Sequence, residues 1–217
     1  MENLYLAAGV VLAYLAGSIP SSVWIGKIFY DIDVRTQGSG NAGATNTIRV
    51  LGAKAGIPVM LFDVFKGWFA VFLWHFFAPD TLSPEQLVWF KIVLGTAAVI
   101  GHVYPVFAQF RGGKGIATLL GVGIALYPES ALFVFILFAL ILTLTHYVSV
   151  SSITASLSFP LVVVFVFNQQ SVPLIVLAIF VALFVPFTHR SNIKRLLNGT
   201  ESKFSFKRKQ KTGDKSH

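Results

Sequence analysis

A glycine-rich basic loop, residues 107–115 with the sequence FAQFRGGKG, holds the side chains best suited to bind an anion, since Arg111 and Lys114 supply two positive charges. Glycine has no side chain to keep a ligand away from the backbone amides, which can then donate to an oxyanion. An apolar helix is expected to begin at Ile116, and its N-terminal dipole would add to this attraction. The pattern predicts phosphate binding, although a basic turn between two membrane helices would have the same composition. The residues of this loop that we expect to touch substrate are Gly112, Gly113, Lys114 and Gly115.

A second polar segment, residues 37–49, has the sequence QGSGNAGATNTIR and almost no bulky side chain. Its hydroxyl and amide groups could line a polar site, and a flexible linker would have a similar composition. Its first part fits G-x-G-x-x-G, but a dinucleotide site needs a preceding strand and a βαβ unit, which hydrophobic helical segments on both sides exclude. The candidate site residues are Gly38, Ser39, Gly40, Asn41, Gly43, Thr45, Asn46 and Arg49.

Two charged side chains, Asp63 and Lys66, lie inside a hydrophobic segment. Charges within a membrane are costly and are usually paired or functional. Their spacing of three residues places both on one face of a helix. We expect either an internal ion pair that holds helices together or two groups that face a polar cavity.

Smaller polar groups lie at or near the ends of three later hydrophobic segments. His102 lies shortly before the glycine-rich loop, and Ser149 lies in a polar stretch at 145–152. His189 and Asn192 are three residues apart, so they share a face if a helix continues there. A single histidine at a membrane edge is usually structural, and His102 is compatible with that role as well.

These groups must be positioned by membrane helices. The chain has 217 residues, 55% of them hydrophobic and only 12% charged, with a mean hydropathy of +0.72. Such a composition is far too apolar for an ordinary soluble domain. We predict an all-α integral membrane protein, a bundle of about seven transmembrane helices, with six or eight as alternatives because several segments are shorter than about 20 residues. The hydrophobic segments are 4–29, 57–77, 87–107, 116–126, 131–144, 151–167 and 172–187.

The distribution of basic residues predicts the orientation of this bundle, because Lys and Arg concentrate in cytoplasmic loops. With seven helices, the segments 1–3, 78–86, 127–130 and 168–171 would lie outside, and they contain no Lys or Arg. The opposite segments carry 14 of the 17 basic residues. We therefore expect the N-terminus outside and the C-terminus in the cytoplasm, with the first helix retained because Glu2 stands where a signal peptide needs positive charge.

The C-terminal part is strongly basic, since nine of the 17 Lys and Arg residues follow Phe187. A basic tail after a membrane helix favours contact with anionic lipid over nucleic acid. We expect one transmembrane domain at 1–202 and a disordered cytoplasmic tail at 203–217. The absence of cysteine excludes disulfides, thiolate nucleophiles and cysteine metal sites.

All the candidate groups described so far fall on the predicted cytoplasmic side, which favours one shared polar cavity with an anionic ligand. One further motif does not fall on the cytoplasmic side. His75 and Asp80 match the H-x-x-x-x-D pattern of one class of acyltransferases, but they lie at the predicted outer face. We interpret that match as a coincidence.

In combination, these motifs resemble the bacterial acyl-phosphate:glycerol-3-phosphate acyltransferases, the PlsY family. The resemblance extends from the first helix to the last, and the pairing of the 38–46 and 110–115 segments is its most specific part. The matching segments are GSIPS at 17–21, GSGN at 38–41, GATN at 43–46, Arg49, Asp63, Lys66, Gly101, His102, Pro105, GGKG at 112–115, His189, Arg190, Asn192 and GTE at 199–201.

This resemblance implies an enzyme of the bacterial cytoplasmic (inner) membrane that transfers a fatty acyl group from acyl phosphate to the sn-1 hydroxyl of glycerol 3-phosphate, giving lysophosphatidic acid and phosphate. It implies no metal, cofactor, nucleic acid or obligate protein partner. The catalytic base would be His189 or the acceptor's own phosphate. A transporter of a phosphorylated metabolite is the alternative. The implied catalytic residues are Ser39, Arg49, Lys114, His189 and Asn192, the substrate-binding residues are those of the two segments above with His102 and Ser149, and the structural residues are Asp63, Lys66 and Glu201.

Overall fold

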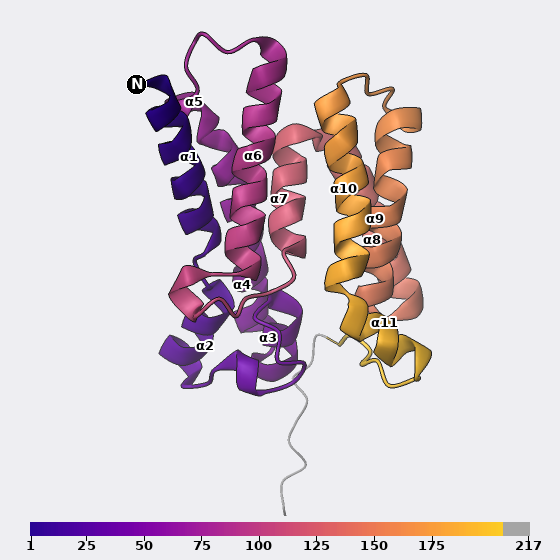
Figure 1. Ribbon diagram of the computed structural model, residues 1–217. Helices are drawn as coiled ribbons and strands as arrows, with labels where there is room; N and C mark the ends of the chain where they lie inside the picture. The colour runs from indigo at the N-terminus through magenta and orange to yellow at the C-terminus, as the bar shows by residue number, and fades with distance from the viewer. Residues whose placement is uncertain (206–217) are drawn as a thin grey trace, which may run out of the picture.

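The computed structural model describes residues 1–205, and every regular element in that range is a helix (Figure 1). Residues 206–217, most of the predicted basic tail, lie outside the described part. The long elements are α1 (Glu2–Gly17), α2 (Ser21–Tyr30), α4 (Ala53–Phe72), α6 (Pro84–Val103), α7 (Ile116–Leu126), α8 (Pro128–Thr145), α9 (Val148–Leu161) and α10 (Val172–Thr188). The short elements are η1 (Val34–Thr36), α3 (Ala44–Leu51), α5 (Trp74–Phe77), η2 (Val106–Ala108), the π-helical η3 (Val162–Val166) and α11 (Arg190–Leu197).

Four helical segments are long and apolar enough to cross a membrane, namely Ala53–Phe77, Pro84–Ala108, Pro128–Thr145 and Val148–Val166. Two bent pairs, α1 with α2 and α10 with α11, raise the number of candidate spans to six. The remaining apolar helix, α7, has only 11 residues. The prediction of an all-helical integral membrane protein is confirmed, with four to six candidate spans by length and composition.

The first hydrophobic segment is bent where small polar residues interrupt it. Helices α1 and α2 meet at an angle of 40°, and the break lies between Ser18 and Pro20. Gly17 is buried there against the backbone of Ala98 on α6, with which a Cβ at this position would collide. The small residues therefore let α1 and α6 pack closely.

The helices form two groups that meet along α7 (Figure 1). Helices α1, α4 and α6 pack together, α7 packs against α4, and α8, α9 and α10 pack side by side. A buried cluster joins the groups through Ile92 of α6, Tyr127 at the α7–α8 junction and Leu177 of α10. The space between the groups holds the candidate site.

Two segments expected to be loops are helical instead. Residues Ala44–Leu51 form α3, whose apolar face packs against α4, so this segment is not a linker. Its Ile48 lies against Gly56, where a Cβ would meet the amide nitrogen of Ile48 at 2.8 Å. Ser149 lies in the first turn of α9 rather than in a loop. Both stretches are short and rich in small polar residues, which favours loops in isolation, and tertiary packing overrides that preference.

The start of the predicted tail also departs from expectation. The amide of Phe204 donates to the carbonyl oxygen of His146 at 2.7 Å, and the Lys203 ammonium lies 6.0 Å from the Tyr147 ring centre. Residues 203–205 therefore contact the turn between α8 and α9.

Candidate active site

One large cavity of about 1610 Å³ lies between the two helix groups. Its lining residues come from α3 and α11, which lie at one end of the bundle (Figure 1), and from α7, α8, α9 and α10. Most of the predicted site residues line it, whereas Gly112 and Lys66 lie beside it rather than in its wall. Those in the wall are Gly38, Ser39, Gly40, Asn41, Gly43, Thr45, Asn46, Arg49, Asp63, His102, Gly113, Lys114, Gly115, Ser149, His189, Asn192 and Glu201.

The glycine-rich loop works differently from the sequence-based expectation. The amide of Gly113 donates to the carbonyl oxygen of His102 at 3.1 Å, and that of Gly112 donates to Val103 at 3.2 Å. These amides satisfy carbonyl groups at the end of α6, so in this structure they are not free to donate to an oxyanion. Phosphate binding by the amides of Gly112 and Gly113 stays a prediction, and a ligand would have to replace these two bonds.

The glycines instead let the loop lie against α6, because a Cβ at Gly112 would collide with the carbonyl oxygen of His102. Gly115 has a φ of +80°, a left-handed conformation that favours glycine, and α7 begins at the next residue. The first-turn amides of α7 have no intrahelical partner, and Ile116 and Ala117 line the cavity. The N-terminus of α7 and Lys114 are thus the parts of this loop that line the cavity and can attract an anion.

Lys114 is held by a chain of side chains from the other helix group. Its ammonium donates to Oδ1 of Asn192, and Nδ2 of Asn192 donates to Oε1 of Glu201 at 2.6 Å. Asn192 lies in α11, after a bend of 57° from α10. The bend thus brings the last predicted motif to the glycine-rich loop.

Glu201 is the centre of this network. Its Oε1 also accepts from the Ser149 hydroxyl at 2.9 Å, and its Oε2 accepts from Nε of Arg195 at 2.7 Å. Burial alone would raise the pKa of Glu201, but the hydrogen bonds from Asn192, Arg195 and Ser149 bring it below its usual value. The carboxylate therefore stays ionised and orders the groups around it.

The cavity wall has excess positive charge. Burial lowers the pKa of Lys114 to about 8, with Glu201 opposing the shift and the charges of Arg195 and Arg49 adding to it. Burial likewise lowers the pKa of Arg49, which lines the cavity with no ion pair within residues 1–205. Near Lys114, Glu201 faces the three cations Lys114, Arg49 and Arg195, while the other carboxylate of the wall, Asp63, is paired with Lys66. An anionic ligand would therefore lower the electrostatic energy of the site.

His189 is oriented by the backbone. Its Nδ1 lies 2.8 Å from the carbonyl oxygen of Val185, which makes Nδ1 the protonated donor of the neutral ring. The side chain is 2% exposed and lines the cavity. Nε2 is therefore the ring nitrogen available to a ligand.

The segment before α3 is shaped by Asn46. Its Oδ1 accepts from the amide of Ser39 at 2.8 Å, and its Nδ2 donates to the carbonyl oxygens of Val34 and Gln37. A Cβ at Gly38, where φ is +64°, would collide with the same Oδ1. Asn46 thus holds the turn that presents Ser39 to the cavity.

Asp63 and Lys66 form the ion pair expected from their spacing, with Nζ 2.8 Å from Oδ1. Lys66 also donates to the carbonyl oxygen of Ile19 at 3.0 Å, and the Ser21 hydroxyl donates to Asp63 at 2.9 Å. The pair therefore binds the α1–α2 break to α4. His102 lies at its edge, with Nδ1 3.6 Å from Asp63.

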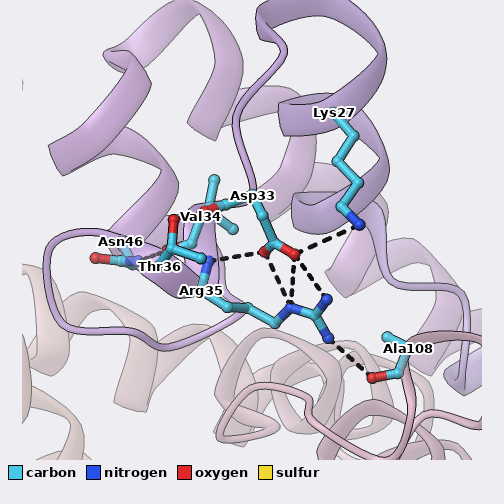
Figure 2. A network of polar contacts seen from close by, with 7 residues as sticks. All are labelled: Lys27, Asp33, Val34, Arg35, Thr36, Asn46 and Ala108. Atoms are coloured by element: carbon cyan, nitrogen blue, oxygen red, sulfur yellow. Dashed lines mark hydrogen bonds and ion pairs between the residues drawn. The ribbon is translucent and has the colours of Figure 1, made fainter.

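A second ion pair, not singled out in the sequence, joins the two predicted substrate segments (Figure 2). Arg35 makes a bidentate contact with Asp33, with Nη2 2.7 Å from Oδ2, and its Nη1 donates to the carbonyl oxygen of Ala108 at 2.9 Å. The Arg35 hydrogen bond holds the pKa of Asp33 well below its usual range, and Asp33 raises the pKa of Arg35. Lys27 adds a longer contact to Asp33 at 3.5 Å.

Sequence reasoning missed other groups in the cavity. Arg195 follows Asn192 by three residues, a helical spacing that could have identified it. Ser152 and Ser156 follow Ser149 on one face of α9, at spacings of three and seven. The apolar part of the wall has no motif, because ordinary transmembrane residues form it. These apolar residues include Leu119, Val122, Val134, Phe135, Phe138, Phe159, Leu177 and Val181.

His75 lies outside the cavity, and the described residues form no metal site. His75, in α5, makes its hydrogen bond to the carbonyl oxygen of Phe72 and does not line the cavity. Within residues 1–205, His, Asp and Glu side chains form no cluster of three or more that could hold a metal ion.

The chain is similar to known proteins over most of its length. The profile of the family described as glycerol-3-phosphate acyltransferase matches residues 7–199. Glycerol-3-phosphate acyltransferase of Fusobacterium nucleatum is 43% identical over 198 residues, covering 91% of this chain and 97% of the relative. That of Listeria monocytogenes serovar 1/2a is 45% identical over 204 residues, covering 94% and 98%.

Two solved structures of one such enzyme have a similar fold. The crystal structure of PlsY, an integral membrane glycerol 3-phosphate acyltransferase, in its glycerol 3-phosphate form has a TM-score of 0.81 and 40% identity, with 92% of this chain and 96% of that chain covered. Its lysophosphatidic acid form has a TM-score of 0.78 and 39% identity, with 93% and 96% covered. The resemblance seen in the motifs is confirmed, and the transporter alternative is not supported. The chain belongs to the family of PlsY-type glycerol-3-phosphate acyltransferases.

Proposed function

We propose that this chain transfers a fatty acyl group from acyl phosphate to the sn-1 hydroxyl of glycerol 3-phosphate and releases lysophosphatidic acid and phosphate. The observation that carries the proposal is one cavity with a cationic end, around Lys114 and Arg49, and a long apolar continuation between α7 and α10. The similar PlsY structures are described with glycerol 3-phosphate and with lysophosphatidic acid. A cavity of this shape suits an acceptor with a phosphate and a donor with both a phosphate and an acyl chain.

The excess of positive charge supports acyl phosphate as the donor. Both substrates then carry phosphate, and two anions repel each other unless nearby cations compensate. Lys114, Arg49 and Arg195 lie near Glu201, and the other carboxylate of the wall, Asp63, is paired with Lys66, so the site can take more than one anionic group. Holding the two substrates together in this way converts their reaction into an intramolecular one.

The proposed reaction needs no enzyme nucleophile. The sn-1 oxygen of glycerol 3-phosphate attacks the carbonyl carbon of the donor, and a new C–O ester bond forms. The bond between the carbonyl carbon and the bridging oxygen breaks, and phosphate leaves with both electrons. The hydroxyl proton passes to the phosphate of the acceptor, which His189, Asn192, Ser39 and Lys114 hold in place.

The remaining site residues have supporting roles in this proposal. Gly38, Gly40, Asn41, Gly43 and Thr45 form the cavity wall near Ser39. Asn46, Ser149 and Glu201 hold other groups through the hydrogen bonds described above. Asp63, Lys66 and His102 fix the helices that carry the glycine-rich loop.

The choice of base can be tested at His189, which lines the cavity and whose Nδ1 is occupied by the carbonyl oxygen of Val185. If the acceptor's phosphate is the base, His189→Ala should raise the KM for glycerol 3-phosphate and keep a substantial kcat at saturation. Initial rates over a range of glycerol 3-phosphate concentrations measure both constants. Loss of kcat with an unchanged KM would instead make His189 the base.

We further propose a seven-span topology with the N-terminus outside, so that the cavity faces the cytoplasm from the bacterial inner membrane. The arrangement of basic residues supports this, because Arg49, Lys114 and Arg195 line the cavity near α3 and α11, at one end of the bundle. Residues 1–202 would then form one acyltransferase domain, and anionic lipid would contact the basic residues that follow.

The donor is tested with the purified chain in detergent. Labelled glycerol 3-phosphate is combined in parallel with palmitoyl phosphate, palmitoyl-CoA or palmitoyl carrier protein. We expect labelled lysophosphatidic acid from the acyl phosphate alone and its loss in Lys114→Ala. Product from a thioester donor, with none from acyl phosphate, would keep the reaction and overturn the donor.

A further inference from the structure

Arg190 is a cation at the rim of the cavity. It lines the cavity and is nevertheless an exposed residue, so it borders both the cavity and the surroundings of the protein. In the same wall, Lys114 donates to Asn192, and Arg195 donates to Glu201. The Arg190 guanidinium, by contrast, has neither a hydrogen bond nor an ion pair within residues 1–205. Its N–H donors are therefore open to a ligand.

Phe187 holds this charge in position. The guanidinium carbon of Arg190 lies 5.0 Å from the centre of the Phe187 ring, a distance at which a cation and an aromatic ring attract each other. Phe187 also lines the cavity and is 61% exposed, so it lies at the rim as well. The pair presents an apolar ring beside a positive charge, which matches the polarity of a single-tailed lipid with a phosphate head group.

An apolar stripe on α10 leads to this pair. Leu177, Val181 and Val185 recur at every fourth residue on one helix face, and all three line the cavity. From Leu177 to Val185 the stripe is about 12 Å long at the helical rise. The chain then bends by 57° into α11, whose first residue is Arg190. A hydrocarbon chain that lies along the stripe would therefore have its head group at the bend.

The head group of the acyl donor is itself a phosphate. In the proposed reaction the groups around Lys114 hold the phosphate of the acceptor, and a second phosphate at the same place would be repelled unless it had a cation of its own. Arg49, on α3, also has no ion pair within residues 1–205, but Arg190 is the cation that adjoins the end of the α10 stripe. We infer that Arg190 binds the phosphate of the acyl donor and that Phe187 contacts the beginning of its chain. This inference rests on the donor proposed above.

This placement also gives the leaving group a way out. When the acceptor hydroxyl attacks the carbonyl carbon, the bond from that carbon to the bridging oxygen breaks, and the phosphate leaves with both electrons. That phosphate then lies at Arg190, an exposed residue, so it can pass from the rim into water while the acylated product is still in the cavity. Arg190 neither gains nor loses a proton, because a guanidinium stays charged.

The first test compares Arg190→Ala with Lys194→Ala in phosphatidylcholine nanodiscs, with palmitoyl phosphate as the donor. Each variant removes one positive charge from α11, but Lys194 is an exposed residue that does not line the cavity. Arg190→Ala should raise the KM for palmitoyl phosphate about tenfold, the scale of one hydrogen bond between charged groups, and leave the KM for glycerol 3-phosphate unchanged. Lys194→Ala should keep both parent values. Arg190→Lys should recover part of the loss, because lysine keeps the charge without the planar fork of donors.

The second test measures binding without acyl transfer. Hexadecyl phosphate has a phosphate and a chain but no acyl group, so it should inhibit in competition with palmitoyl phosphate. Its inhibition constant should rise in Arg190→Ala, whereas that of uncharged hexadecanol should not change. Phe187→Ala should raise both constants, because it removes an apolar contact. Leu183→Ala is the matched control, since Leu183 is exposed on the same helix without lining the cavity, and it should raise neither constant.

The outcomes separate the two proposals. Both substituted residues on α11 are exposed, so all variants there should unfold at the parent temperature in detergent. An unchanged KM for palmitoyl phosphate in Arg190→Ala, or an equal rise in Arg190→Ala and Lys194→Ala, would overturn the role of Arg190 and leave the donor in place. A rise in the KM for glycerol 3-phosphate alone would overturn it as well, by placing Arg190 against the acceptor. Failure of the parent chain to use palmitoyl phosphate would overturn the donor and, with it, the contact with Arg190.

Discussion

At the scale of single residues, the charge of Lys114 is the property of the site most easily changed by conditions. Burial brings its pKa to about 8, so a modest rise in pH removes the proton from an ammonium that faces the cavity. Arg49 and Arg195 keep their charge over the same range because a guanidinium titrates far higher. Lys114 is therefore the cation through which pH should act on substrate binding.

The corresponding prediction concerns the KM for glycerol 3-phosphate. Below pH 8 the group is mostly charged and attracts the acceptor phosphate; above it the group is mostly neutral and the attraction weakens. The KM should rise as pH increases through about 8, and initial rates in buffers of constant ionic strength measure it. In Lys114→Arg the rise should move to a higher pH. A KM that stays constant well above pH 8 in the parent chain would contradict this.

At the scale of elements, the site depends on contacts that hold separate segments at fixed positions. Asn46 shapes the turn before α3, Asp63 and Lys66 hold the α1–α2 break against α4, and Glu201 ties α9 to α11. Arg35, next to the segment that carries Ser39, is bonded to Ala108 in the loop that carries Lys114, and so holds the two segments together. Because substrates must meet between these segments, a contact outside the cavity can affect the reaction.

Arg35 provides the prediction at this scale (Figure 2). Arg35→Ala removes the bond to the Ala108 carbonyl and the ion pair with Asp33, so the two segments can move apart. We expect kcat/KM to fall by about fivefold, which corresponds to about 1 kcal/mol for a partly exposed pair. Steady-state kinetics with both substrates varied measure the loss. The matched control is Lys27→Ala, which loses only the longer contact to the same Asp33 carboxylate and keeps the bond to Ala108, so it should change kcat/KM less. Equal effects of the two variants would contradict the positioning role.

At the scale of the whole molecule, the depth of the cavity matters. From Lys114 to Tyr127 the chain advances 13 residues, most of them in α7, which spans about 20 Å at the helical rise. One acyl tail occupies about half of a hydrocarbon core that is about 30 Å thick. The cavity can therefore hold a tail of ordinary membrane length between α7 and α10, and its far end determines how long that tail can be.

Tyr127 closes that end. Its hydroxyl donates to the carbonyl oxygen of Leu174 at 2.6 Å, and its ring meets Phe159 edge to face with the ring centres 5.2 Å apart. Tyr127→Ala should open space for a longer donor and raise the ratio of kcat/KM for stearoyl phosphate to kcat/KM for palmitoyl phosphate. Because burial of each added methylene contributes about 0.8 kcal/mol, the ratio should rise by up to about fourfold per methylene. Competition between the two donors, with products resolved by mass, measures the ratio. Tyr127→Phe, which keeps the ring, should keep the parent ratio, and an unchanged ratio in Tyr127→Ala would place the end elsewhere.

The sequence predicted much of this arrangement because the relevant signals are local. Hydrophobic composition is a property of each segment, and it predicted a helical membrane protein. The break at Pro20 and the pairing of Asp63 with Lys66 follow from neighbouring residues on one helix. The motifs identified the family, and most candidate site residues do line one cavity.

Contacts between distant segments could be predicted only in part, because they depend on how the helices pack. The amides of Gly112 and Gly113 were expected to bind phosphate, but they bond to α6, whose end lies beside them only in the folded chain. Residues 44–51 looked like a loop because their burial comes from α4. Arg35 and Ala108 are 73 residues apart, and no local pattern joins them.

By itself, then, the sequence determined the membrane class, the family and the set of chemically capable side chains, because each depends on residue type and short spacing. The tertiary structure alone decided which loop amides bond to α6, which side chains surround Lys114 and which apolar residues line the cavity. The physical reason is that hydrogen-bond satisfaction and cavity shape depend on the packing of helices that are far apart in the chain.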